Sequence, residues 1–188
     1  MGRSLAIVLV LNFLYPWNMK DVRFQIRVLT SDDAANYREI RLEALRCSPE
    51  AFGSTFEVEN ARPLASFAER LHSGAKMFGA FEGAEIVGIA GLLIKQGQKE
   101  AHKGLLVGMY VRPGSRKFGV GRRLAETVID FARGLVELIQ LGVVSDNESA
   151  RRLYERLGFV EYGVERKALK QDGRYYDEVL MAKYLTPD

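Results

Sequence analysis

The stretch with the clearest chemical potential in this sequence is Arg116-Lys117-Phe118-Gly119-Val120-Gly121, which joins a predicted strand ending at Val111 to a predicted helix. Backbone N–H groups at the start of a helix have no intrahelical partner and carry a partial positive charge. Gly119 and Gly121 lack a β-carbon, so an anion can approach the main chain closely, and Arg116 can add charge-assisted hydrogen bonds. The stretch therefore predicts a binding site for a diphosphate group.

Two other glycine motifs that bind phosphate fit this stretch less well. A Walker-type loop ends in Gly-Lys-Ser or Gly-Lys-Thr, whereas Gly121 is followed by Arg122. The dinucleotide fingerprint needs a third glycine or an alanine three residues after the second glycine, where Leu124 stands. The stretch instead spells Arg-x-x-Gly-x-Gly.

This pattern resembles the signature with which the GNAT-type N-acetyltransferase superfamily binds the pyrophosphate of coenzyme A. A second block, from Asn147 to Phe159, resembles the Asn-x-x-Ala-x-x-Leu-Tyr-x-x-x-Gly-Phe block of the same superfamily and follows the next predicted strand. The two motifs occur in the expected order, and with the early helices and the terminal hairpin the resemblance covers about residues 23–185. Lys117 departs from many relatives, which have glycine there, but the motif leaves that position free.

The resemblance implies that the protein uses acetyl-CoA and assigns residues to it. Main-chain atoms near Met109, Tyr110 and Val111 would hold the pantetheine arm and the acetyl group. Residues 116–121 would hold the pyrophosphate, and Asn147 would hydrogen-bond the arm. Tyr154 would place its phenol near the thioester sulfur. The residues expected to bind acetyl-CoA are Met109, Tyr110, Val111, Arg116, Lys117, Phe118, Gly119, Val120, Gly121, Asn147 and Tyr154.

Elementary chemistry agrees with a catalytic role for Tyr154. Acetyl transfer to an amine leaves negative charge on a thiolate, and a phenol with an ordinary pKa of about 10 can donate a proton or a strong hydrogen bond to it. A backbone N–H in the same gap, that of Tyr110, could stabilise the oxyanion of the tetrahedral intermediate. A base for the incoming amine is less evident, and Glu57, Glu59 or a chain of water molecules could accept its proton.

Each candidate residue also has a purely structural interpretation. Gly119 and Gly121 could serve an ordinary turn. Tyr154 could simply pack at helical spacing against leucines, and Asn147 could cap the helix that follows it. His102 precedes a predicted strand and could act as a base near neutral pH, or it could be a solvated surface residue.

The elements that position these residues follow from hydrophobic periodicity and turn residues. Alternating apolar residues predict a strand near residues 24–29, and side-chain oxygens at residues 30–33 predict the start of a helix that Ser48-Pro49 ends. Pro63 opens a second helix with Gly74 as a left-handed stop, and residues 50–62 are expected to be a loop. Further strands are predicted at residues 77–81, 86–94, 105–111, 136–144, 160–170 and 176–184, with helices at 121–133 and 149–157.

This order predicts a single α/β (α+β) domain over residues 23–188. The resemblance implies a GNAT-like mixed, mostly antiparallel central sheet of about seven strands with flanking helices, splayed between the fourth and fifth strands. Residues 1–22 are expected to be a leader or N-terminal extension, because the apolar run Leu5–Leu11 is shorter than the roughly 20 residues that span a bilayer. A signal peptide would need a small-x-small cleavage site, and none is convincing here. The remaining alternatives are an extension before a natural start at Met19 and an apolar strand that packs on the fold or on a second subunit.

Composition and charge exclude several classes of protein. With 188 residues, 47% hydrophobic and 27% charged, the chain has the composition of a soluble globular domain rather than of a disordered segment. The net charge is +3 with the signs interspersed, so the basic block or stripe of a nucleic-acid binder is missing. Cys47 is the single cysteine, which excludes an intramolecular disulfide, and His72 and His102 are too few to build a Cys/His metal cluster.

The sequence therefore predicts an N-acetyltransferase that transfers an acetyl group from acetyl-CoA to a primary amine by direct attack in a ternary complex, with no metal. The acceptor is expected to be a small-molecule amine or a protein or peptide amine. No nucleic-acid or membrane partner is expected, a cytoplasmic location is the simplest, and a homodimer is one option. The alternative is a non-catalytic module that binds or senses acyl-CoA. The loops at residues 50–62 and 96–103 are expected to set acceptor specificity.

Overall fold

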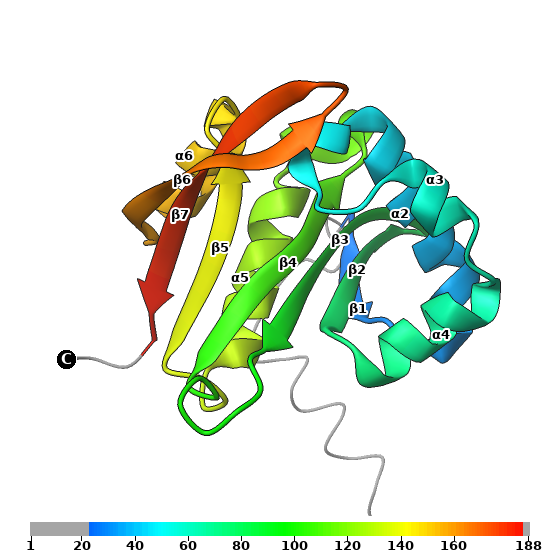
Figure 1. Cartoon of the computed structure of the whole chain (residues 1–188). Helices are drawn as coiled ribbons and strands as arrows, with labels where there is room; N and C mark the ends of the chain where they lie inside the picture. Colours follow the sequence, from blue (N-terminus) through cyan, green and yellow to red (C-terminus); the bar gives the residue numbers. More distant parts are fainter. Residues whose placement is uncertain (1–22, 186–188) are drawn as a thin grey trace, which may run out of the picture.

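A computed structural model of the chain describes residues 23–185, and the predicted leader, residues 1–22, lies outside them. One mixed sheet forms the centre, with the strand order β1-β2-β3-β4-β5-β7-β6 (Figure 1). Neighbouring strands are antiparallel except β4 and β5, which run parallel. This confirms the predicted seven-stranded, mostly antiparallel sheet with flanking helices. No helix within residues 23–185 is long and apolar enough to cross a membrane.

The elements fall close to the ranges that the sequence predicts. The strands are β1 (Gln25–Val28), β2 (Lys76–Glu82), β3 (Glu85–Ile94), β4 (Lys103–Val111), β5 (Leu138–Val144), β6 (Val160–Gln171) and β7 (Arg174–Tyr184). The α-helices are α2 (Ala34–Cys47), α3 (Phe56–Asn60), α4 (Leu64–Ser73), α5 (Val120–Ala132) and α6 (Glu148–Arg156). Short 3-10 helices, η1 (Ser31–Asp33), η2 (Pro49–Ala51) and η3 (Pro113–Phe118), connect them.

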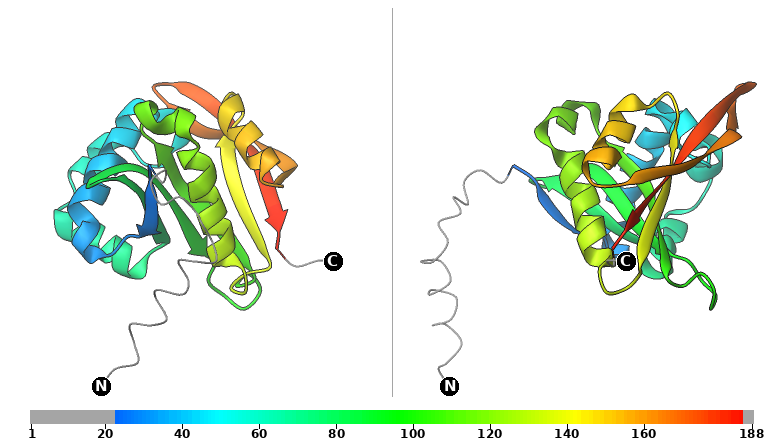
Figure 2. Two further views of the ribbon diagram at one scale, coloured as in Figure 1. Left: turned by 180° about the vertical axis from the view of Figure 1, so that it is seen from behind. Right: turned by 90° about the vertical axis from the view of Figure 1, so that its left-hand side faces the viewer.

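Helices pack on both faces of the sheet, and each face has its own apolar core (Figure 2). On what we call the α5 face, α5 contributes fully buried residues such as Leu124 and Val128. On the α2 face, α2 and α4 contribute Ile40 and Phe67 to a second core. Because side chains alternate along a strand, the residues of β5 and β7 that do not enter the α5 core point to the α2 face. The residues of β5 and β7 in the α5 core are Ile139, Leu141, Val143, Val179 and Met181.

β4 and β5 separate soon after they begin. Their parallel pairing is confined to Lys103–Leu105 against Leu138–Gln140, although the strands continue to Val111 and Val144. β4 also bulges against β3 near Gly108, whose φ of +64° suits glycine. The far ends of β4 and β5, at the top of Figure 1, therefore lie apart, which confirms the predicted splay.

Two predictions for the first half of the chain are wrong in detail. Residues 50–62 are not a plain loop, because they contain the helix α3, whose N-cap Thr55 accepts a hydrogen bond from the N–H of Val58. Gly74 ends α4 as predicted, but at φ −90° and ψ −146° it is not left-handed. Glycine fits there because a β-carbon would lie 2.5 Å from the carbonyl oxygen of Arg70.

Candidate active site

A cavity of about 750 Å³ opens beyond the separated ends of β4 and β5. Its volume is in the range of small-molecule sites. The lining comes from the end of β4, the start of α5, one side of α6 along its whole length, and the segment from the end of α2 to just past η2. The residues predicted to bind acetyl-CoA that line it are Met109, Tyr110, Val111, Arg116, Gly119, Gly121 and Asn147.

The start of α5 forms an open cradle for an anion. Gly119, the N-cap residue, has φ +76° and ψ +8°, a left-handed conformation that glycine adopts without strain. No side chain caps this helix start, so the N–H groups of its first turn have no intrahelical partner. A β-carbon on Gly121 would lie 3.6 Å from Leu153 and Val111 and 3.9 Å from Met109. The missing side chain thus leaves space among the residues that line the cavity.

Arg116 bends back from η3 toward the end of β4. Its Nε donates to the carbonyl oxygen of Val111 at 2.9 Å, and its guanidinium carbon lies 5.8 Å from the centre of the Tyr110 ring.

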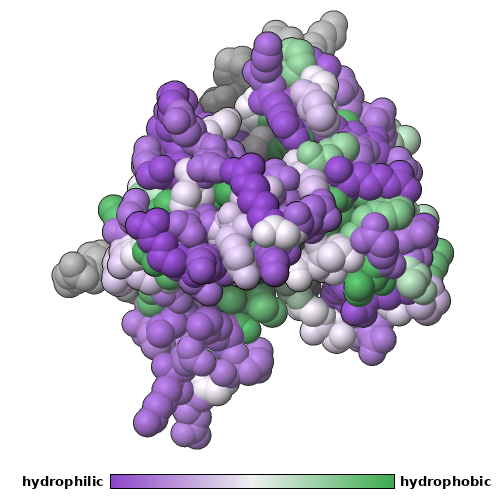
Figure 3. Space-filling view, turned by 45° about the horizontal axis from the view of Figure 1, so that its top comes forward, coloured by the Kyte–Doolittle hydropathy of each residue, from purple (hydrophilic) through white to green (hydrophobic). Residues whose placement is uncertain are grey.

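Other arginines also surround the cavity, but most of their charge is neutralised nearby. Arg122 pairs with Glu126 at 2.8 Å, and Arg152 pairs with Glu148. Arg156 also lines the cavity and, within residues 23–185, forms no ion pair. Seen with the top of Figure 1 brought forward, this end of the molecule is covered mostly by hydrophilic side chains, with hydrophobic ones showing between them (Figure 3).

Asn147 caps a helix and also lines the cavity. Its side-chain oxygen accepts a hydrogen bond from the N–H of Ala150 at 3.1 Å and caps α6. The same residue lines the cavity, and the side-chain NH₂ group remains available as a donor.

Tyr154 does not line the cavity, although Ala150 and Leu153 on the same helix do. The side chain is 5% exposed, and its ring packs edge-to-face on Phe159 with 5.7 Å between the ring centres. Burial raises the pKa of the Tyr154 phenol, so its hydroxyl stays protonated at neutral pH and can act as a donor. Its catalytic role stays a prediction.

Three further residues of the predicted set lie outside the cavity lining. Lys117 is exposed. Phe118 is half exposed and lies under the Arg23 guanidinium, 3.6 Å from the ring centre. Val120 is fully buried in the α5-face core. These residues can offer main-chain atoms to a ligand, but their side chains point elsewhere.

A charged network on the α2 face fixes the end of β4, and the sequence alone does not predict it. The Tyr110 hydroxyl donates to Glu43 at 3.0 Å, and Arg112 Nε donates to the other oxygen of Glu43 at 2.9 Å. Arg112 also pairs with Glu39 at 2.7 Å and with Glu85. Glu39 and Glu43 share one face of α2 at i, i+4, but their partner Arg112 follows β4, far away in the chain, so no local pattern identifies it.

The candidate bases Glu57, Glu59 and His102 have different surroundings in the structure. Glu59 is 3% exposed and pairs with Arg70 at 3.0 Å and Arg41 at 3.5 Å. Burial opposes its ionisation, but the two guanidinium groups outweigh burial and hold the pKa of Glu59 below its ordinary value, which makes it a poor proton acceptor. Glu57 is exposed on the same helix. His102 precedes β4 and lies at the end of that strand remote from the cavity.

Comparisons with known proteins point to one family. The model of the Acetyltransferase (GNAT) family matches residues 37–159. The chain is 33% identical over 134 residues to the N-alpha-acetyltransferase RimI of Mycobacterium tuberculosis, covering 71% of this chain and 82% of that protein. A GNAT-family acetyltransferase from Streptococcus pneumoniae superposes with a TM-score of 0.78 at 22% identity, covering 87% of this chain and 99% of the other. The Salmonella typhimurium protein yncA, solved with its cofactor acetyl-CoA, superposes with a TM-score of 0.74 at 24% identity, covering 88% and 95%.

Proposed function

The chain belongs to the GNAT family of acetyltransferases, and on that premise we propose that it transfers an acetyl group from acetyl-CoA to a primary amine by direct attack in a ternary complex. The observation that carries this proposal is the uncapped, glycine-lined start of α5, which opens into a cavity beside the separated ends of β4 and β5. Such a helix start suits a pyrophosphate, and separated strand edges suit an extended amide-bearing arm.

Three groups of residues would hold acetyl-CoA. The N–H groups at residues 119–122 and the Arg116 guanidinium would bind the pyrophosphate. The edge of β4 at Met109–Val111 would offer N–H and C=O groups to the pantetheine arm, which would lie along it like an additional strand. Asn147 would keep its helix-capping bond and donate its NH₂ group to the arm.

The chain's contribution to the reaction would be positioning, charge stabilisation and proton donation. Holding amine and thioester together removes much of the entropic barrier. The N–H of Tyr110 would stabilise the oxyanion that develops on the carbonyl oxygen. Tyr154, kept protonated by burial that raises its pKa, would donate to the sulfur as the C–S bond breaks.

The acceptor that we propose is the α-amino group of a polypeptide. It is supported by the 33% identity to a protein named as an N-alpha-acetyltransferase. A second cavity, of about 220 Å³, lies between residues 49–55 and residues 168–171 and shares Phe52 with the first. A cavity of that size beside the thioester site can take a terminal residue while the rest of the peptide stays outside.

A panel of amines, assayed for release of the coenzyme A thiol from acetyl-CoA, tests the function and the acceptor together. Peptides with a free N-terminus and no lysine should release thiol, and the same peptides blocked at the N-terminus should not. Thiol release with small amines alone would contradict the polypeptide acceptor. Coenzyme A binding without thiol release for any amine would favour a non-catalytic acyl-CoA-binding or sensing module.

A further inference from the structure

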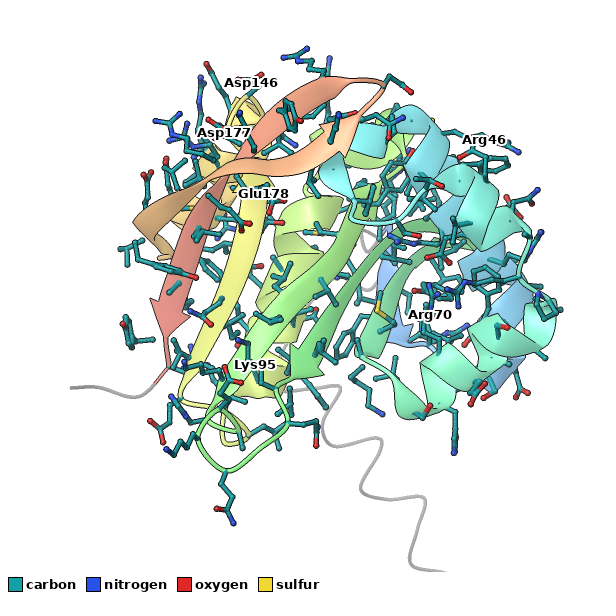
Figure 4. All side chains as sticks on the ribbon, viewed as in Figure 1. Arg46, Arg70, Lys95, Asp146, Asp177 and Glu178 are labelled. Atoms are coloured by element: carbon teal, nitrogen blue, oxygen red, sulfur yellow. The ribbon has the colours of Figure 1, made fainter. Side chains whose placement is uncertain are left out.

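Glu178 is a partly buried carboxylate that the mechanism above leaves unused. It lies on β7 directly opposite Val144, the last residue of β5. Its neighbour Val179 enters the α5-face core, so Glu178 points to the α2 face. In Figure 4, Glu178 lies against the upper end of β5, where that strand diverges from β4.

β5 leaves space for this carboxylate. A β-carbon on Gly142 would lie 2.7 Å from Oε2 of Glu178 and 3.2 Å from its Cδ. Gly142 does not have a positive φ, so its backbone conformation does not require glycine. Room for the Glu178 side chain therefore accounts for the glycine at this position.

Within residues 23–185, Glu178 forms no ion pair that would neutralise it, and the residue paired with it on β6 is another carboxylate, Glu165. β5 is uncharged, and η2, which packs against β5 and β6, carries Glu50. The adjacent Asp177, by contrast, is bound by Arg166 at 2.6 Å. Burial, and then the charge of Glu165, raise the pKa of Glu178, which improves a carboxylate as a proton acceptor near neutral pH.

We propose that Glu178 takes a proton from the acceptor ammonium ion, directly or through one water molecule, before the amine attacks the thioester. This inference rests on the proposed acetyl transfer and supplies the base that the transfer needs, because α-amines with a pKa of about 7.7–8.0 are largely protonated at pH 7. The cavity reaches the α2 face through Ser48, Phe52 and Tyr110. Glu178 lines neither cavity, but it points to the same face beside the gap between the strand ends, so a water molecule would carry the proton to it from an acceptor that enters there.

The three protons of the ammonium ion are accounted for as follows. Glu178 accepts the first, and the nitrogen lone pair then forms the bond to the thioester carbonyl carbon. The C–S bond breaks with its electron pair going to sulfur, which takes a proton from Tyr154. The second ammonium proton restores the Tyr154 phenol, the third stays on the amide, and Glu178 releases its proton to water.

Glu178→Gln tests the role directly, because it keeps the shape of the side chain and removes the basic oxygen. With a lysine-free peptide of free N-terminus, kcat/KM at pH 7 should fall by about 10²-fold, within the usual range for general base catalysis. The Kd for coenzyme A should not change, because Glu178 does not line the cavity. The loss should shrink above about pH 9, where the α-amine is already neutral.

Two further variants separate a base from a structural residue. Glu165→Gln is the matched control on the neighbouring strand. It should stay active and shift the acidic limb of the kcat/KM profile to lower pH, because the like charge that raises the pKa of Glu178 is gone. Gly142→Ala should lower kcat/KM without altering coenzyme A binding, because its β-carbon displaces the Glu178 carboxylate.

The outcomes distinguish this inference from the proposed function. Wild-type kcat/KM for Glu178→Gln at every pH, or a loss of the same size at every pH, would overturn the assignment of Glu178 and leave the acetyl transfer standing. Failure of the unmodified protein to acetylate any amine would overturn both.

Discussion

Among single residues, Tyr154 has the most demanding proposed role, and its surroundings define the test. Tyr154→Phe keeps the ring that packs on Phe159 and removes the proton that the leaving thiolate would take. Turnover should fall at least about tenfold, since general acid catalysis typically contributes 10²–10⁴, while the Kd for coenzyme A and the thermal midpoint stay close to those of the unmodified protein. Stopped thiol-release assays and calorimetry measure these quantities. Unchanged turnover would remove Tyr154 from the mechanism.

Gly121 is the residue on which the cradle can be tested most cleanly. Its β-carbon would meet its neighbours at 3.6 Å or more, so Gly121→Val should fold, but the added methyl groups would occupy the cavity. Affinity for coenzyme A should fall at least about tenfold, or 1.4 kcal/mol. Gly114→Val is the matched control, because a β-carbon on Gly114 meets nothing within 4 Å and this residue does not line the cavity. Equal affinities of the two variants in calorimetry would contradict the cradle.

At the scale of elements, α3 is tied to α2 and α4 by the buried ion pairs of Glu59. Glu59→Gln leaves Arg41 and Arg70 without their carboxylate, and breaking a buried pair in this way costs about 3–5 kcal/mol of unfolding free energy. Glu57→Gln, on the exposed side of the same helix, should change it by less than about 0.5 kcal/mol. Urea unfolding curves measure both. A small effect of Glu59→Gln would show that α3 is held by its apolar contacts.

Because of the same ion pairs, the stabilisation that Glu59 contributes to the fold depends on pH. The pKa of Glu59 is lower in the folded chain than its ordinary value, so the folded state binds protons less readily than the unfolded state at this site. The stabilisation is fully present above the unfolded pKa of about 4.3 and is lost as pH falls through the lower, folded pKa. The difference in unfolding free energy between the unmodified protein and Glu59→Gln should therefore narrow below pH 4.

The elements differ in how far local sequence predicts them. The ranges of α5 and α6 are marked by strong amphipathic spacing and by glycines, and Gly158, with φ +83°, ends α6 as predicted. Local sequence does not predict the helix α3, because five residues are too few for a periodic pattern. The conformation of Gly74 depends on the close approach of the Arg70 carbonyl oxygen, which a residue pattern does not contain.

The candidate site likewise contains one part that local sequence predicts and one part that only the fold brings together. The cradle at Gly119 and Gly121 is local in sequence, so its motif identifies it. The position of Glu178 depends on strand pairing with β5 and on the space that Gly142 leaves. Two residues that far apart in the chain come together through the order of the sheet, and no spacing rule connects them.

For the whole molecule, the described domain holds all of the proposed machinery. The cavity lining lies between residues 48 and 156, so a chain that begins at Met19 should bind coenzyme A with the affinity of the full chain. Calorimetry on the two forms measures this, and size-exclusion chromatography shows whether the first 18 residues change the oligomeric state. Weaker binding by the shorter chain would assign those residues a part in the site.

The bond from Arg116 Nε to the Val111 carbonyl oxygen links the two ends of the ligand-binding region energetically. If the guanidinium turns to a phosphate, that oxygen loses its donor, and an amide of the pantetheine arm can take over. A nucleotide fragment without the arm would leave the oxygen to water alone. We therefore expect intact coenzyme A to bind more tightly than the separate affinities of its nucleotide and pantetheine halves would give.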